Sequence, residues 1–288
     1  MLTAMNRVLM VAPDAAATGT SWERLLDARP EGTRARPALG ATAHLWRLGD
    51  GWVEILTPDG DGIVADALAA RGPHLFAGGF TTPDLDAFAA HLAQQDIRAL
   101  EDDDRLMLDP QSCGIQGLRL FIEGEDEQPP VGLVDTFYEL TDLVDDAPRE
   151  TARVARLLGL DAAEFMPITS EPYGYAGTLT LIDPDRLDRL EMITPNRPDT
   201  TIDRFFQRTG GGLYMAFAES GQLAEIERRA LEAGVGHTAV PREGSRDSLG
   251  AHSLFLHPKT LGGMMLGLSR RTYAWTWSGR PERVEAAQ

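Results

Sequence analysis

The feature that most constrains the fold of this 288-residue chain is an internal repeat. The segment from Phe76 to Glu123 reads as a strand, an amphipathic helix, an acidic loop and a Pro-x-x-x-Gly turn before a final strand. The segment from Tyr214 to Leu268 repeats that order. Both predicted helices carry apolar residues at the i, i+3, i+4 spacing of an amphipathic helix. These are Leu85, Phe88, Ala89 and Leu92 in the first, and Leu223, Ile226 and Leu231 in the second.

Two further segments open with a strand and a helix and close with another strand, so the chain reads as four β-α-β-β-β modules. Their spans are 5–60, 72–124, 133–196 and 210–270. We therefore predict an α+β fold with the modules in two pairs. The acidic, Pro-containing stretch 125–132 has no apolar period and is the expected linker. The predicted domains are residues 1–124 and 133–275, followed by a tail at 276–288.

Charge and composition limit the kinds of molecule that this protein is expected to bind. The formal net charge is −17, which argues against nucleic acid because phosphate binding needs clustered Lys and Arg. No apolar run approaches the roughly 20 residues of a membrane span, and the first residues lack the layout of a signal peptide. The single cysteine, Cys113, rules out an intramolecular disulfide. We expect a cytoplasmic protein whose partner is a small molecule.

Several motifs in this order resemble the vicinal oxygen chelate superfamily, which includes glyoxalase I, methylmalonyl-CoA epimerase, extradiol dioxygenases and bleomycin-resistance proteins. HPKTLGGMML is similar to the end of the epimerase, NRVLMVAPD to its opening, and EMITPNRPDTTIDRFFQRTGGGLYMAF to the stretch that joins its two modules. The resemblance implies that each pair of modules forms a cup-shaped mixed sheet with helices outside. The concave face of such a sheet is a place for a ligand.

The resemblance also implies four metal-ligand positions in each pair, normally two His and two Glu or Gln. In the N-terminal pair these positions hold Arg7, Glu54, Ala77 (or Phe76) and Arg119. Guanidinium groups do not bind cations, so one ligand survives. This half is interpreted as a degenerate module, or alternatively as a carboxylate-binding site in which Arg7 and Arg119 flank Glu54.

In the C-terminal pair the same positions hold Thr136, Glu191, Tyr214 (or Met215) and Gly267. Again one strong ligand remains, which disfavours the two-His, one-Glu iron site of ring-cleaving dioxygenases and also glyoxalase I activity. We predict no metal site and no cofactor, while leaving a divalent metal open.

Three residues are candidates for catalysis in the C-terminal cup. Glu191 beside apolar neighbours would have a raised pKa and act as a general base. Tyr214 would donate to a developing enolate oxygen, His252 would point into the same cup, and Gly267 would leave room for a substrate. The plainer alternatives are a surface Glu191, a core Tyr214 and a His252 outside the cup.

The C-terminal segment Arg271 to Pro281 alternates Tyr273, Trp275 and Trp277, as on one face of an extended strand. These rings would pack on the core, contact the ligand or join a homodimer.

Two functions follow from these residues. The first is an isomerase or lyase that is metal-independent or atypical in metal use, and that moves a proton on a small apolar carbonyl or carboxylate compound. The second is a binding protein that sequesters a ligand without chemistry, as bleomycin-resistance proteins do. A module with both sites lost, serving only interactions, is the third interpretation.

Overall fold

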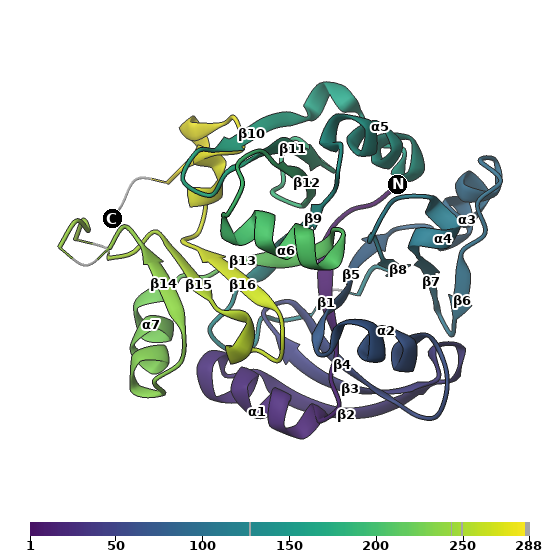
Figure 1. Ribbon diagram of the computed structural model, residues 1–288, viewed down its shortest axis with the longest axis horizontal. Helices are drawn as coiled ribbons and strands as arrows, with labels where there is room; N and C mark the ends of the chain where they lie inside the picture. Colours follow the sequence, from purple (N-terminus) through teal and green to yellow (C-terminus); the bar gives the residue numbers. More distant parts are fainter. Residues whose placement is uncertain (127, 243, 249, 286–288) are drawn as a thin grey trace. The chain divides into compact units, whose positions relative to one another are not determined.

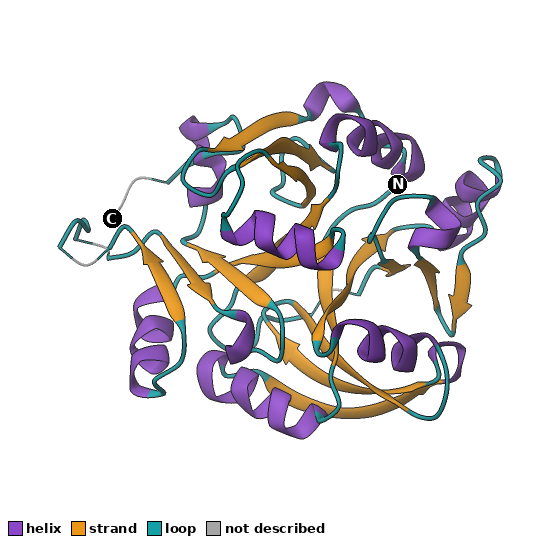
Figure 2. Ribbon diagram, in the orientation of Figure 1, coloured by secondary structure: helices purple, strands orange, loops and turns teal. Residues whose placement is uncertain are grey.

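The computed structural model describes residues 1–126, 128–242, 244–248 and 250–285. It contains the four predicted modules in order, joined by two connecting helices (Figures 1 and 2). The first comprises β1 (Met5–Val11), α1 (Ala15–Leu26), β2 (Arg29–Arg36), β3 (Ala41–Leu48) and β4 (Gly51–Pro58). The second comprises β5 (His74–Thr82), α3 (Leu85–Ala93), β6 (Leu100–Asp102), β7 (Arg105–Leu108), the short α4 (Pro110–Cys113) and β8 (Leu120–Gly124).

The third and fourth modules repeat this plan. The third comprises β9 (Thr136–Leu143), α5 (Ala147–Leu158), β10 (Met166–Ser170), β11 (Tyr175–Leu181) and β12 (Arg189–Pro195). The fourth comprises β13 (Gly212–Glu219), α7 (Leu223–Glu232), β14 (His237–Val240), β15 (Ser253–Leu256) and β16 (Met265–Ser269). The connecting helices are α2 (Ile63–Arg71) and α6 (Thr201–Thr209).

The strands form two mixed eight-stranded sheets, in the orders β2-β3-β4-β1-β5-β8-β7-β6 and β10-β11-β12-β9-β13-β16-β15-β14. In every module the first strand pairs in parallel with the last, and the last three strands pair in antiparallel. Parallel strands need a long crossover connection between them, and in each module a helix and the two middle strands form it. The predicted α+β class and the four modules in two pairs are confirmed.

An acidic N-cap starts the helix in three of the four modules. Asp14, Asp84 and Asp146 each follow the first strand of their module, and each accepts a hydrogen bond from the backbone N–H three residues later. Such a cap satisfies one of the unpaired N–H groups of the first helical turn, a contribution of about 1 kcal/mol. In these three modules the repeated aspartate lies two or three residues after the end of the first strand and therefore favours the start of a helix there.

The chain packs as two compact units. One contains residues 1–5, 77–126 and 139–214, and thus most of the second and third modules. The other contains residues 6–76, 127–138 and 215–288, and thus the first and fourth modules. The domain boundaries expected around the linker 125–132 stay a prediction. No helix in the described part of the chain is long and apolar enough to cross a membrane.

Two local expectations were wrong. Leu231 was placed on the buried stripe of its helix, but its side chain is 63% exposed and Ala230 is buried instead. The segment with alternating aromatic residues is not extended, because residues Tyr273–Thr276 form a turn of 3-10 helix. The Ser278 hydroxyl donates to the Ala274 carbonyl and holds that turn, and the Trp275 side chain is buried.

Candidate functional site

The candidate site lies on β12 and on the part of β9 from Glu139 onward, which run in parallel and belong to one unit. Their register places Arg189 beside Glu139 and Glu191 beside Thr141. Side chains two residues apart on a strand point to the same face of the sheet. The pairing therefore gathers two carboxyl groups, a guanidinium and a hydroxyl on one face.

These four side chains are joined by short polar contacts in a buried environment. Arg189 Nε donates to Glu139 Oε2 at 2.6 Å, and the Thr141 hydroxyl donates to Glu191 Oε2 at 2.6 Å. Exposure is 4% for Glu191, and all four residues are buried. Ionised groups at such depth are costly unless they are paired, so the protonation of this cluster is strongly constrained.

Burial, followed by the negative charge of Glu139, raises the pKa of Glu191 to about 8. The Thr141 hydroxyl, the Arg189 guanidinium and the Tyr175 hydroxyl act in the opposite direction. Burial also raises the pKa of Glu139, against the attraction of Arg189. Because Glu139 has the ion pair, Glu191 is the carboxyl that keeps a proton near neutrality.

Tyr175 is a member of this site that sequence reasoning missed. It starts β11, where Tyr175, Gly177 and Leu179 lie opposite Pro195, Ile193 and Glu191 of β12. A Cβ atom at Gly177 would meet the Met192 carbonyl and Ile193 of β12, so the missing side chain lets the two strands approach closely. The Tyr175 hydroxyl is hydrogen-bonded to Glu191, and burial together with that carboxyl raises the pKa of Tyr175. Only the strand register could have identified it.

Helix α6 covers the neighbouring part of this face (Figure 1). Ile202, Phe205 and Phe206 of α6 pack with Leu143 of β9 and Ile193 of β12 in one apolar cluster, and Ile168, Tyr175 and Tyr214 join it. The rings of Tyr214 and Phe205 meet edge to face at 5.0 Å. Burial raises the pKa of Tyr214 to about 12. Both the predicted base and its predicted partner thus lie in this unit, and Tyr175 bonds to the first and packs on the same apolar cluster as the second.

The remaining residues predicted for the C-terminal pair lie in the other unit. The Thr136 hydroxyl donates to the carbonyl of Phe137. The His252 ring stacks on Tyr273 at 4.2 Å, and burial followed by the charge of Arg270 lowers the pKa of His252. The Arg283 guanidinium lies over the ring of Trp275 at 4.8 Å.

The space beside Gly267 is filled by a side chain of the protein. Gly267 lies on β16 opposite Phe217 of β13 and Phe255 of β15. A Cβ atom at position 267 would come within 2.3 Å of the Phe217 ring, and the Phe217 and Phe255 rings are 5.6 Å apart. The missing side chain therefore accommodates Phe217.

Gly267→Ala is expected to destabilise the protein by about 1–3 kcal/mol, because the Phe217 ring must leave its position. Urea unfolding measures the loss. The double variant Gly267→Ala, Phe217→Leu should recover part of it, whereas equal loss in the single and double variants would contradict the proposed clash.

The N-terminal pair contains a second buried ionic cluster. Arg7 Nη1 lies 3.1 Å from Glu54 Oε2, as the flanking arrangement implied, and Arg36 Nε lies 3.5 Å from Glu54 Oε1. Arg36 was missed because β2 is a strongly polar segment without apolar alternation. The Arg7 guanidinium also lies over the ring of Trp52 at 5.5 Å. Arg119 belongs to the other compact unit.

The side chains do not fit the divalent metal that the resemblance implies. Across the residues that the structure describes, no three His, Cys, Asp or Glu side chains come together as a metal site. At the expected ligand positions, each sheet offers one carboxylate as a metal ligand. The other positions hold guanidinium, hydroxyl or phenol groups, or side chains that cannot bind a metal. Guanidinium groups repel a cation.

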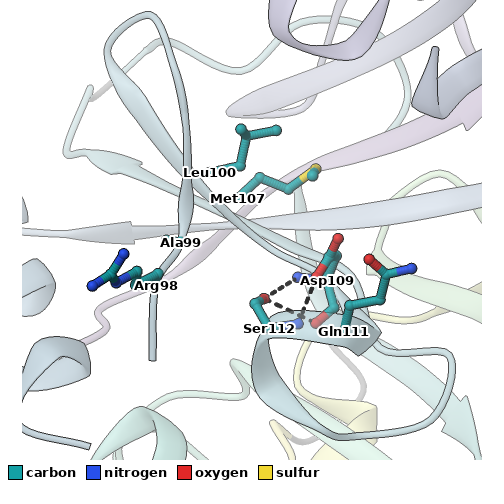
Figure 3. A pocket seen from close by; sticks show the side chains of 7 residues that line it. All are labelled: Arg98, Ala99, Leu100, Met107, Asp109, Gln111 and Ser112. Carbon is teal, nitrogen blue, oxygen red and sulfur yellow. Dashed lines mark hydrogen bonds between the residues drawn. The ribbon is translucent and has the colours of Figure 1, made fainter. Parts of the chain in front are cut away.

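Two surface hollows lie away from both clusters. One of about 260 Å³ is lined by Arg24, Arg228, Arg229 and Glu232. The other, of about 390 Å³, lies beside α4 and is shown in Figure 3, where Asp109 and Ser112 bond to each other in a helix-capping box. Neither contains a residue predicted for the site.

Comparison with known proteins shows the fold. No protein-family model and no curated protein sequence matches the chain. A variant of 4-hydroxymandelate synthase from Streptomyces coelicolor is similar in structure, with a TM-score of 0.71 and 14% identity over 94% of this chain and 93% of that one. A fusion of a xylose isomerase-like TIM barrel with 4-hydroxyphenylpyruvate dioxygenase matches with a TM-score of 0.65 and 13% identity, over 94% of this chain and 49% of that one. The chain thus shares the fold of these two structures, and this fold agrees with the four-module α+β architecture expected from the sequence.

Proposed function

We propose that this protein is an isomerase or lyase that moves a proton at the carbon beside the carbonyl or carboxylate of a small apolar compound. The observation that carries the proposal is the buried Glu191, whose pKa of about 8 lies close to neutral pH. A general base works best when its pKa is near the working pH, because it then both accepts and returns the proton readily.

The proton transfer needs only groups of this chain. The Glu191 carboxylate takes the proton from the carbon, and the C–H electron pair moves into the carbon–carbon bond as the carbonyl oxygen becomes an enolate. Within the described residues the Tyr214 hydroxyl has no hydrogen-bond partner, so it is the group that we assign to donate to that oxygen. The protonated Glu191 then returns the proton to carbon, or the enolate expels a leaving group.

Tyr175 and Thr141 hold the Glu191 carboxyl in place through its two hydrogen bonds. A carboxyl fixed in this way transfers its proton in one geometry, which lowers the entropic part of the barrier. Glu191 is 4% exposed, so the half-buried rings of Tyr175, Tyr214 and Phe205 must shift for a substrate to reach it.

The proposal is tested by hydrogen–deuterium exchange into a panel of small ketones, followed by NMR in heavy water. Wild-type protein should catalyse exchange at a rate that rises with pH and levels off above about pH 8. Glu191→Gln should lose about 100-fold or more of that rate. Glu150→Gln is the matched control, because Glu150 is a buried carboxylate of the same unit that pairs with Arg149 and Arg153. Equal exchange by wild type and Glu191→Gln would refute the proposal.

Sequestration without chemistry is the second candidate. The half-buried rings of Phe205 and Tyr214, 5.0 Å apart, pack on the apolar cluster beside Glu191 and would hold a ligand by contact alone. Binding of a ketone by wild type and Glu191→Gln alike, with exchange in neither, would favour this function.

A further inference from the structure

We propose that the Glu191 site takes an uncharged carbonyl compound and rejects carboxylates, and that Glu139 sets this specificity by occupying Arg189. The inference rests on the proposed function in one respect, namely that the ligand binds beside Glu191. It narrows the substrate class from carbonyl or carboxylate compounds to neutral ones.

Arg189 is the cation of this face, and its guanidinium is committed to Glu139. Both Nε and Nη2 lie 2.6 Å from Glu139 Oε2, and Nη1 donates to the Leu187 carbonyl at 3.4 Å. The Arg189 side chain is 0% exposed and that of Glu139 2% exposed. An ion pair at such depth is not displaced readily, because separating its members leaves two buried charges unpaired.

Among the described side chains on this face of β9 and β12, no excess cation is left for an anion. Two carboxyl groups share one guanidinium, so the net charge is zero when Glu191 holds its proton and −1 when it does not. Thr141, Tyr175 and Tyr214 contribute neutral hydroxyl groups. A ligand carboxylate would lose its hydration and face Glu139 and Glu191, whereas a ketone oxygen needs only a hydroxyl donor.

The arginines on and before α6, the helix that covers part of this face, add no cation to the Glu191 site. Arg197, Arg204 and Arg208 on and before α6 are exposed. Arg197 donates to the Pro172 carbonyl and Arg204 to the Asp199 carbonyl, and the Arg208 guanidinium lies over Phe205 at 5.7 Å. Their charges are therefore solvated on the outer side of the apolar cluster.

Two variants isolate the charge of Glu139. In Glu191→Gln the Glu139–Arg189 pair is intact and the site is neutral. In the double variant Glu139→Gln, Glu191→Gln the guanidinium is the remaining charge, and ionised Glu191 cannot replace the lost partner. The probes are methyl propyl ketone, methyl levulinate and levulinate, because levulinate adds a carboxylate to the ketone skeleton and its ester removes the charge again.

Ligand-detected NMR titrations with these probes test the inference. Wild type and Glu191→Gln should bind the ketone and the ester about 10-fold or more tightly than levulinate, a difference of about 1.4 kcal/mol. The double variant should gain about 10-fold in levulinate affinity while its affinity for the ketone changes little. Equal binding of levulinate and its ester by wild type, or a folded double variant without the gain, would overturn the inference, as would failure of wild type to bind both neutral probes at millimolar concentration.

The comparison of levulinate with its ester uses wild-type protein, so it stands even if the double variant does not fold. The result is also separable from the proposed chemistry. Selective binding of the neutral probes without deuterium exchange would support this specificity and refute proton transfer.

Discussion

Glu191→Gln is expected to make the protein more stable than wild type in mildly alkaline solution and to leave its stability in acid nearly unchanged. The usual pKa of a glutamate is 4.5, and burial raises that of Glu191 to about 8 in the folded protein. Between these values the folded state binds a proton that the unfolded chain has released. Raising the pH therefore favours unfolding over this window, by up to about 1.4 kcal/mol per pH unit.

The stabilising contribution of protonated Glu191 is fully present below pH 4.5 and is lost progressively as the pH rises to about 8. Above about pH 8 the resulting loss in free energy of unfolding is constant. Glutamine at position 191 is neutral at every pH and fills nearly the same volume, so it removes the cost. We expect the variant to exceed wild type by about 3–5 kcal/mol in free energy of unfolding near pH 9.

Urea unfolding at about one-unit pH intervals from acid to alkaline measures both proteins. Glu150→Gln is again the control, because the Glu150 carboxylate pairs with two arginines and its replacement should cost stability at neutral pH instead of adding it. Parallel pH curves for wild type and Glu191→Gln would show that Glu191 titrates at its ordinary pKa, and would remove the physical basis of the proposed base.

The four-module architecture was predictable because each module carries its own periodic signals. Apolar residues mark the first and last strands, a 3.6-residue period marks the helices, and in the second and fourth modules a Pro-x-x-x-Gly turn precedes the last strand. An aspartate such as Asp14 or Asp84 caps the helix after the first strand. All these signals are local, so a sequence reading finds them without knowing which strands pair.

The membership of the Glu191 site was only partly predictable. Glu191 and Tyr214 follow from the positions that the resemblance implies, but Glu139, Arg189 and Tyr175 enter through the register of β9, β12 and β11. Register depends on how whole strands align, and a shift by one residue would move every side chain to the other face. A sequence without a structure does not specify that alignment.

In the C-terminal segment, by contrast, a local sequence pattern predicts the wrong secondary structure. Tyr273, Trp275 and Trp277 alternate as in a strand, yet they lie in and just after a 3-10 turn. Thr272 before it has a left-handed backbone, with φ of 61°, and begins the turn. Tyr273 stacks on His252, Trp277 lies beside Phe217, and the Tyr273 and Trp277 rings meet edge to face at 5.6 Å. Tertiary packing thus overrides alternation in a short segment.

Glu54→Gln is the second substitution with a large expected effect, because one buried carboxylate serves two buried guanidinium groups. The Glu54 side chain is 0% exposed, and the side chains of Arg7 and Arg36 are 9% and 2% exposed. Removing the negative charge leaves two like charges close together at low dielectric. We expect a loss of about 3–5 kcal/mol in free energy of unfolding, measured by urea at neutral pH.

A triple variant separates the unpaired charges from the loss of the contacts themselves. Arg7→Met, Glu54→Leu and Arg36→Met together replace the whole cluster by apolar side chains of similar length, and buried ion clusters replaced in this way are often as stable as the original or more stable. The triple variant should therefore unfold at a higher urea concentration than Glu54→Gln alone. If it is no more stable than the single variant, the three side chains stabilise the N-terminal modules mainly through packing and hydrogen bonds, and the charge of Glu54 is not what holds Arg7 and Arg36 in place.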